Sequence, residues 1–256
     1  MVQKIYSYNV NGLRSAMNKG FDVWLRDEQP DILCLQETKA QPDQIDMSPF
    51  ERLGYRHYWN SAQKKGYSGV ALFSKCKPDR VTYGMDMGKY DAEGRMLRAD
   101  FGDVSVISVY FPSGTMGDTR QAFKMDFLDD VLQYLENLRK ERPNLIISGD
   151  YNIAHTDADI NFPRKHDKMS GFLPEERAWF DAFVAHGYVD TFRMFHSEPN
   201  VYSWWSYRSQ ARTKDLGWRI DYHMATRPLQ ERIKDAYILQ NATHSDHCPV
   251  AVAVDF

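Results

Sequence analysis

The sequence predicts an α/β protein in which two mixed sheets, mostly antiparallel, pack face to face with helices outside. Two strand–helix pairs support this prediction: one opens the chain, and the other precedes the apolar run before Asp150. The segment between them alternates short apolar stretches with turn residues, a spacing typical of hairpins and therefore of antiparallel pairing. Because each sheet must bury its apolar face, the expected arrangement is a layered α/β sandwich.

The first element is a strand over residues 4–10, which ends at an Asn-Gly turn pair. Apolar side chains at helical spacing then predict a helix that stops near Pro30. Residues 31–37 follow as a buried strand with Glu37 at its end. This strand–helix–strand order is typical of an α/β unit.

The middle of the chain is predicted to form five short strands joined by turns. They cover Tyr55–Trp59, Gly69–Ser74, Arg80–Tyr83, Arg95–Phe101 and Val104–Phe111. Asp118 can cap the long helix that follows, which runs to about Lys140. Its apolar stripe comprises Phe123, Phe127, Val131, Tyr134 and Leu138.

The last part of the chain returns to alternating elements. Residues 146–150 form a buried strand, and Glu175–Ala185 form a helix begun by a proline in its first turn. Short strands are expected at 219–223 and 249–254, whereas residues 229–239 give no clear pattern. The final strand closes the sheet system.

Length and composition fit one domain covering residues 1–256. Hydrophobic residues make up 43% of the chain, and no apolar run is long enough to span a bilayer. The net charge of −3 argues against coating nucleic acid by bulk charge, but it allows an enzyme with a local basic surface. The three cysteines lack zinc spacing, so we expect buried, reduced thiols in a cytoplasmic protein. We expect a monomer, because nothing indicates oligomerisation.

Polar residues recur where the predicted strands end. They are Asn9, Asn11, Glu37, Tyr110, Asp150, Asn152, Asp221, Ser245, Asp246 and His247. Because side chains two apart on a strand face the same side, Asp150 and Asn152 can act together. Oxygen ligands select hard cations such as Mg²⁺ or Mn²⁺, and a single His beside a carboxylate indicates an oriented imidazole rather than a zinc site.

Each of these signals also has an ordinary structural interpretation. Asp150 and Asn152 can belong to a turn, and residues 245–247 can form another. Glu37 can be a solvated strand end. Asp221 is harder to explain in this way, because a lone carboxylate among apolar residues is costly to bury unpaired. The hypothesis of a site therefore depends on the joint occurrence of these residues.

Five motifs span nearly the whole chain. They are Tyr8–Arg14, Leu35–Lys39, Gly149–His155, Gly217–Tyr222 and Ser245–Pro249. Together they closely resemble the exonuclease III family of apurinic/apyrimidinic (AP) DNA endonucleases, part of the endonuclease/exonuclease/phosphatase superfamily. The resemblance implies a four-layer α/β sandwich and a Mg²⁺-dependent enzyme of base excision repair, with Mn²⁺ as a substitute. Such an enzyme cuts 5′ to an abasic site and leaves a 3′-hydroxyl.

The same resemblance implies a role for each site residue. The implied metal ligands are Glu37, Asn9, Asp246, Asp150 and Asn152. Asp150 would also position or deprotonate the attacking water, and Asn152 would hold the scissile phosphate. His247, oriented by Asp221, would bind a phosphate oxygen, and Tyr110 would contact the phosphate near the leaving oxygen.

Residues 204–219 form the densest aromatic and basic segment, which is typical of a nucleic-acid surface. The alternative is a core loop with solvated charges. The resemblance implies that Trp204 and Trp218 line a pocket for the flipped abasic sugar, and flipping costs least where the base is missing. The other expected DNA contacts are Arg208, Arg212, Arg219, Lys64, Ser113 and Ser170.

The expected substrate is double-stranded DNA with abasic sites or blocked 3′ ends, with 3′-to-5′ exonuclease and 3′-phosphodiesterase activity beside the endonuclease. The runner-up is another phosphodiesterase of the superfamily, such as a nonspecific nuclease or a lipid or inositol phosphatase. A DNA-binding module without catalysis is a third hypothesis, and the full set of site residues argues against it. No membrane partner is expected, and the location is cytoplasmic, with nucleoid association in a prokaryote or nuclear location in a eukaryote.

Overall fold

Two six-stranded sheets form the centre of the computed structural model, which describes all 256 residues. The strands of the first sheet, in spatial order, are β13 (Ile233–Ile238), β14 (Val250–Asp255), β1 (Val2–Asn9), β2 (Ile32–Gln36), β4 (Val70–Ser74) and β3 (Arg56–Asn60). Those of the second are β5 (Arg80–Tyr83), β6 (Met96–Phe101), β7 (Val104–Tyr110), β8 (Asn144–Asp150), β12 (Asp221–Thr226) and β9 (Tyr188–Asp190). Each sheet has one parallel pair, β1 with β2 and β7 with β8, and its other pairs are antiparallel.

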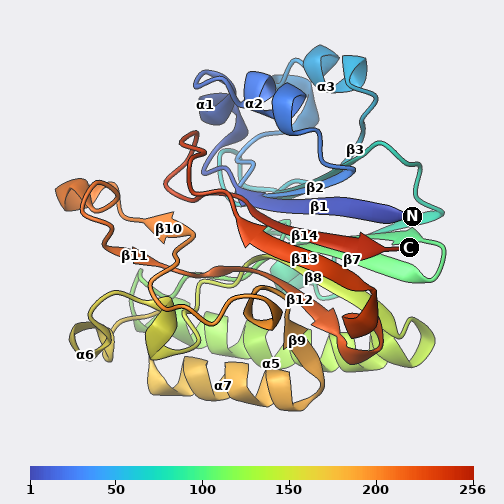
Figure 1. Cartoon of the computed structure of the whole chain (residues 1–256). Helices are drawn as coiled ribbons and strands as arrows, with labels where there is room; N and C mark the ends of the chain where they lie inside the picture. The colour runs from blue at the N-terminus through green and yellow to red at the C-terminus, as the bar shows by residue number, and fades with distance from the viewer.

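Helices cover the outer faces of both sheets, so the molecule has four layers (Figure 1). Above the first sheet lie α1 (Leu13–Met17), α2 (Phe21–Glu28) and α3 (Ser48–Arg52). Below the second lie α5 (Asp118–Glu141) and α7 (Pro174–Ala185). The shorter elements are α4 (Gly88–Asp91), α6 (Pro163–His166), the two-residue strands β10 (Trp204–Trp205) and β11 (Gly217–Trp218), and the 3-10 turns η1 (Pro42–Gln44), η2 (Asp157–Asp159), η3 (Phe192–Met194), η4 (Arg208–Gln210) and η5 (Arg227–Arg232). The predicted four-layer α/β sandwich is confirmed.

Three apolar layers hold this sandwich together. One lies between the two sheets and contains Ile5 of β1 and Val106 of β7. A second joins the first sheet to α2 through Phe21 and Leu25, and the third joins the second sheet to α5 and α7. Each fully buried aliphatic or aromatic side chain contributes about 1.5–3 kcal/mol by leaving water. Removal of apolar surface from water is therefore the main force that fixes the strand ends where the polar residues lie.

The long helix α5 differs in detail from its prediction. It begins at Asp118, so this residue is the first helical residue, and Gly117 takes the cap position. Its buried face comprises Lys124, Phe127, Leu128, Val131 and Leu135. Phe123, Tyr134 and Leu138 are only partly buried against the same core. The helix is thus rotated from the expected stripe, and a lysine occupies a core position.

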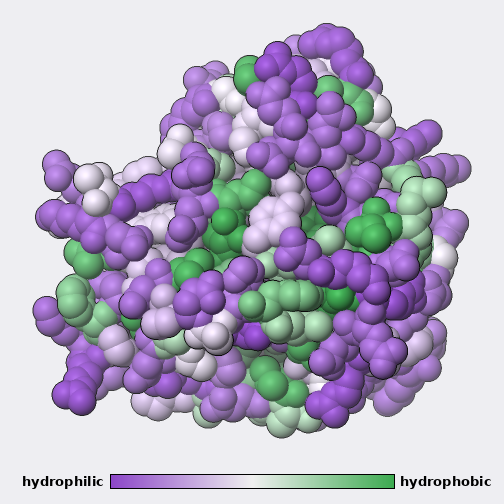
Figure 2. All heavy atoms as spheres, viewed as in Figure 1, coloured by the Kyte–Doolittle hydropathy of each residue, from purple (hydrophilic) through white to green (hydrophobic).

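Other differences concern strand boundaries and one thiol. The strand expected at 219–223 begins at Asp221, and the unassigned segment contains a 3-10 turn followed by β13. Cys34 and Cys248 are buried as expected, but Cys76 is exposed because it lies in the loop that follows β4. The face seen in Figure 2 is mostly hydrophilic with scattered apolar residues. None of the helices combines the length and the apolar character needed to cross a bilayer.

Candidate active site

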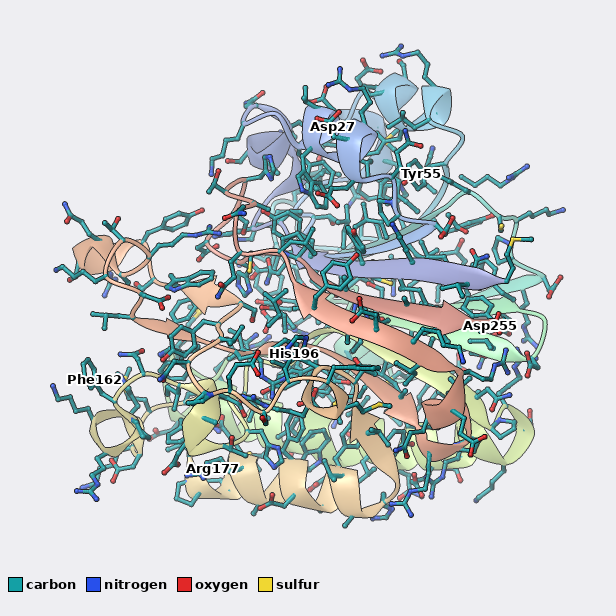
Figure 3. The ribbon with its side chains drawn as sticks, viewed as in Figure 1. Asp27, Tyr55, Phe162, Arg177, His196 and Asp255 are labelled. Atoms are coloured by element: carbon teal, nitrogen blue, oxygen red, sulfur yellow. The ribbon has the colours of Figure 1, made fainter.

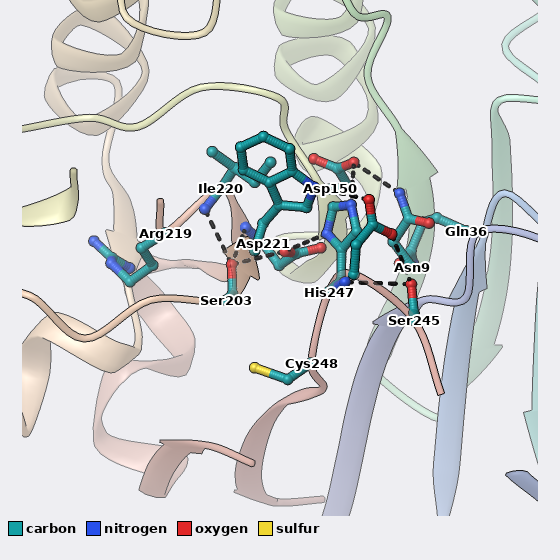
Figure 4. A network of polar contacts seen from close by, with 12 residues as sticks. Asn9, Gln36, Asp150, Ser203, Arg219, Ile220, Asp221, Ser245, His247 and Cys248 are labelled. Carbon is teal, nitrogen blue, oxygen red and sulfur yellow. Dashed lines mark hydrogen bonds and ion pairs between the residues drawn. The ribbon is translucent and has the colours of Figure 1, made fainter. Parts of the chain in front are cut away.

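The predicted site residues meet at one end of the two sheets, although they are far apart in the sequence. Asp150 ends β8, and Asp221 begins β12 directly opposite it in the antiparallel register. Asn9 ends β1 in the facing sheet, and its side chain reaches across to Asp150. An isolated bridge places His247 beside Trp204. The network that results is drawn in Figure 4.

Asp150 is buried, and its carboxylate accepts two short hydrogen bonds and a longer one, at 3.3 Å, from the Asn152 side-chain amide. The amide Nδ2 of Asn9 donates to Asp150 Oδ2 at 2.8 Å, and the backbone N–H of Asn152 donates to Oδ1 at 2.8 Å. The side chain of Asn152 in turn donates to the Phe111 carbonyl at 3.0 Å. Gly149 is required here because a Cβ would overlap the Val109 carbonyl of β7. The group that approaches Gly149 closely is therefore the backbone of the neighbouring strand β7.

His247 is oriented by Asp221. Their Nδ1 and Oδ2 atoms lie 2.8 Å apart, and the Ser203 hydroxyl donates to the same carboxylate oxygen at 2.7 Å (Figure 4). The other ring nitrogen of His247, Nε2, lies 3.9 Å from Asp150 Oδ2 and faces the site. An imidazole whose Nδ1–H donates to a carboxylate turns Nε2 toward the site, and Nε2 can donate to a ligand when the ring is protonated.

The charges in this cluster shift one another. Burial disfavours the imidazolium, but the carboxylates of Asp221 and, next, Asp150 outweigh burial and raise the pKa of His247 to about 10. Burial, and then the charge of Asp221, raises the pKa of Asp150 to about 8, against the opposing effect of His247. His247 is therefore a cation at neutral pH, and Asp150, when it is ionised, has the high proton affinity that a general base needs.

Glu37, Asp150 and His247 place ligand atoms within 4.8 Å of one another. Asn9 Nδ2 donates to Glu37 Oε1 at 2.9 Å as well as to Asp150. The Lys39 ammonium lies 2.8 Å from Glu37 Oε2 and neutralises part of this negative charge. Two carboxylates with a neighbouring amide suit a hard divalent cation.

Asp246 is not part of this ligand cluster. Its carboxylate accepts hydrogen bonds from the Asn11 amide at 2.9 Å and from the Trp204 indole at 3.1 Å. The structure therefore gives Asp246 a second role, which is to hold an aromatic wall of the site. Direct metal ligation by Asp246 stays a prediction.

Tyr110, at the end of β7, contributes a protonated hydroxyl. Burial, and then the charges of Glu37 and Asp150, raise the pKa of Tyr110 well above its ordinary value. The buried Arg95 donates to the Tyr110 carbonyl at 2.9 Å, and its guanidinium carbon lies 4.9 Å from the centre of the phenol ring. Tyr110 is thus a fixed hydrogen-bond donor at the edge of the site.

A cavity of about 240 Å³ opens beside these groups. It is lined by Glu37, Tyr110, Ser113, Thr115, Asp150, Asn152, Met169, Ser170, Gly171, Trp204, Trp218, Ile220, Asp246 and His247. The rings of Trp204 and Trp218 meet edge to face, with centres 5.9 Å apart. The structure therefore brings four of the five predicted catalytic residues, both tryptophans and both predicted serines around one cavity, and the fifth, Asp221, lies behind His247.

The predicted basic DNA contacts divide into exposed and engaged side chains. Lys64 and Arg208 are exposed and free to meet a phosphate backbone. Arg212 is half-buried and donates to the carbonyls of residues 240, 242 and 245. Phe162, 54% exposed, projects from the loop that leads into α6, at the edge of the molecule (Figure 3).

The prediction that Arg219 contacts DNA is wrong. Its side chain is only 1% exposed and donates to Asp159 and Asp190, each at 2.7 Å. The backbone alternates at this point, so the side chain of Arg219 points into the protein while Trp218 faces the cavity. Arg219 is a structural residue that ties β11 to η2 and β9.

We expect the substitution Arg219→Met to lower the free energy of unfolding by about 3–5 kcal/mol, because it takes a buried guanidinium away from Asp159 and Asp190, of which only Asp159 keeps another cation, Arg193. Urea unfolding followed by fluorescence measures this change. The exposed Arg208→Met is the matched control and should leave unfolding unchanged. Equal effects of the two substitutions would contradict the structural role of Arg219.

The sequence did not reveal two buried ionic residues behind the site, Lys124 and Glu176. Both side chains are completely buried and lie 2.6 Å apart. One signal was present, because Lys124 has helical spacing with the apolar residues Leu128, Val131 and Leu135. A lysine in an apolar stripe indicates a buried partner.

Comparisons with known proteins agree with this geometry. The profile of the Endonuclease/Exonuclease/phosphatase family matches residues 6–247. An exodeoxyribonuclease of Bacillus subtilis (strain 168) is 42% identical over 254 residues, which cover 98% of this chain and 99% of the relative. The solved structure of an AP endonuclease from Archaeoglobus fulgidus superposes with a TM-score of 0.89 at 32% identity, covering 99% of this chain and 100% of that chain. The solved structure of a 3′ phosphatase from Neisseria bound to a product DNA hairpin superposes with a TM-score of 0.91 at 29% identity, covering 99% of this chain and 100% of that chain.

Proposed function

The chain belongs to the endonuclease/exonuclease/phosphatase family, and we propose that it is a Mg²⁺-dependent AP endonuclease of the exonuclease III type. It hydrolyses the phosphodiester on the 5′ side of an abasic site and leaves a 3′-hydroxyl and a 5′-deoxyribose phosphate. One observation carries this proposal. Glu37, Asp150 and His247 converge beside a cavity walled by Trp204 and Trp218. A hydrolytic centre next to an aromatic pocket suits a substrate with a missing base.

The catalytic groups divide the work of hydrolysis between them. Asp150 takes a proton from the attacking water, which Asn152 helps to place against the phosphorus. The His247 imidazolium and the Asn152 amide donate to the non-bridging oxygens, where negative charge develops. As the new P–O bond forms, the bond from phosphorus to the upstream 3′ oxygen breaks. Tyr110 lies where its hydroxyl can donate to the phosphate near this leaving oxygen.

Glu37 would hold the metal ion, with Asn9 and Asp150 beside it. A bound Mg²⁺ supplies Lewis-acid neutralisation of the phosphate and of the departing alkoxide. The fit depends on the Asn9 side chain, whose Nδ2 donates to both carboxylates. A rotated amide would present its oxygen instead, giving an all-oxygen set of the kind that Mg²⁺ prefers, at the cost of the hydrogen bond that Asn9 Oδ1 accepts from the Asn11 N–H at 3.0 Å.

Duplex DNA is held through its backbone and its lesion rather than through base edges. Lys64 and Arg208 meet phosphates, and Trp204 and Trp218 flank the extruded sugar. Ser113 and Ser170 line the cavity with small side chains that keep its entrance open. A single domain of residues 1–256, acting as a monomer, carries all of these groups. We propose that the protein is located with the DNA it repairs. This location is the cytoplasm, at the nucleoid, in a prokaryote and the nucleus in a eukaryote.

Cleavage of a duplex with one abasic analogue tests the proposal. We expect a single cut on the 5′ side of the lesion in Mg²⁺, no cut in EDTA, and recovery when Mg²⁺ is restored, with DNA binding retained throughout. An undamaged duplex is the control for lesion selectivity. Release of phosphate from inositol phosphates, without any cut in DNA, would overturn the proposal in favour of another branch of the family.

A second activity is favoured by one comparison, the match to the 3′ phosphatase from Neisseria. The same centre can remove a blocking group from a 3′ end, because the bond broken also joins phosphorus to a 3′ oxygen. A nicked duplex with a 3′-phosphate measures this activity. The proposal predicts release of phosphate that depends on the same Asp150.

A further inference from the structure

A completely buried ion pair lies behind the candidate site. Lys124 comes from α5 and Glu176 from α7, two helices that lie side by side beneath the second sheet (Figure 1). No step of the proposed reaction uses either charge. Removing two ions from water costs free energy that their mutual attraction does not always restore, so this pair is poorly explained by stability alone.

Lys124 reaches the catalytic loop. Its ammonium donates to the backbone carbonyl of Asn152 at 2.8 Å. Asn152 has a left-handed backbone, with φ of 52°, a conformation that asparagine adopts more readily than most residues. Asp150 holds the N–H of this residue, and Lys124 holds its carbonyl. The two contacts together hold the backbone of Asn152, from which its side-chain amide reaches the Phe111 carbonyl and Asp150.

Glu176 reaches the wall of the cavity. It accepts hydrogen bonds from the backbone N–H groups of Gly171 and Leu173, at 2.6 and 3.0 Å, and from the Ser170 hydroxyl at 3.2 Å. Gly171 lies against the pocket, since a Cβ there would be 2.9 Å from the Trp218 ring and 3.1 Å from the Asn152 carbonyl. Glu176 therefore sets the loop that packs against both the sugar pocket and the catalytic residue.

We propose that Lys124 and Glu176 are positioning residues for phosphodiester cleavage, which act together to align Asn152 with the phosphate and residues 170–173 with Trp218. This inference rests on the proposed nuclease function and names the residues that hold the active site in position. Through this pair, one connected set of contacts links the catalytic residue Asn152 to the loop that packs against the sugar pocket. A displacement of about 1 Å at a reacting group can cost about a hundredfold in rate.

The double variant Lys124→Met/Glu176→Gln tests the proposal. A single substitution would leave an uncompensated buried charge, whereas the double variant removes both charges and keeps the volumes similar. We expect kcat on an abasic duplex to fall about tenfold to a hundredfold, with KM changed less than about twofold and a cooperative melting transition retained. Arg98→Met/Asp100→Asn removes another buried pair, which does not line the cavity, and should leave kcat unchanged.

Two further measurements separate positioning from general stability. In an Asn152→Ala background, the double substitution should cost less in single-turnover rate than it does in wild type, because the part of its effect that aligns the Asn152 side chain is already lost. Lys124→Arg keeps a charged donor and should recover most of the kcat that Lys124→Met loses, even if the double variant folds poorly. Wild-type kcat in the double variant, or the same loss in the Asn152→Ala background, would overturn the inference. An inactive wild type would instead overturn the proposed function.

Discussion

Substitution of Asp150 by Asn is expected to reduce kcat on an abasic duplex by about 10²–10⁴-fold while DNA binding is retained. Asparagine has nearly the shape of aspartate, so the packing around β8 survives. Its amide cannot accept a proton from water. The amide also brings a donor to a place where Asn9 and the Asn152 N–H already donate, so one hydrogen bond is lost.

Single-turnover cleavage at saturating enzyme measures this change without interference from product release. Fluorescence anisotropy with the same duplex in a Ca²⁺ buffer measures binding. Asp157→Asn is the matched control, because Asp157 is an exposed carboxylate in η2 that does not line the cavity. An Asp150→Asn enzyme with near wild-type turnover would show that another group deprotonates the water.

The fold could be predicted because its determinants are local. The pattern of each short apolar strand between turns, and that of a long helix with an apolar face, can be recognised within a short segment of the sequence. The details that failed depend on packing. The rotation of α5 follows from the burial of Lys124, and Lys124 can be buried only because Glu176 meets it from another helix. No window of the sequence contains both residues.

The sequence predicted which residues form the site, but it did not predict how they contact one another. Strand periodicity predicts that Asp150 and Asn152 share a face, but β8 ends at Asp150 and Asn152 follows in a left-handed turn, so their contact depends on that turn. The contact between Asn9 and Asp150 crosses from one sheet to the other, so it depends on how the sheets pack. Arg219 illustrates the limit of composition, because it lies in a basic, aromatic segment and yet its side chain points inward to Asp159. The net positive charge of a segment does not determine which of its side chains face solvent.

The pair of His247 and Asp221 gives the second large expected effect, a pH dependence of both stability and rate. The pKa of His247 is raised to about 10 in the folded protein, against about 6.5 in the unfolded chain. A raised pKa contributes stability that is fully present below about pH 6.5 and is lost as the pH rises to about 10. Asp150, with its pKa raised to about 8, also binds its proton more tightly when folded, so its effect has the same sign.

We therefore expect the metal-free protein to lose thermal stability steadily between about pH 6.5 and 10, on the order of a few kcal/mol in all. Asp221→Asn removes the charge that keeps His247 protonated, so its melting temperature should be lower than that of wild type near pH 7 and should converge with it near pH 10. Turnover in Mg²⁺ should fall about tenfold or more in the variant and decline from a lower pH, because neutral His247 no longer stabilises the phosphate oxygens. Differential scanning calorimetry in EDTA and pH–rate profiles in Mg²⁺ measure the two effects. In a His247→Gln background, the further substitution Asp221→Asn should no longer change the pH dependence of the melting temperature. If the melting temperatures of wild type and Asp221→Asn changed with pH in parallel, the imidazole would be neutral in the folded protein.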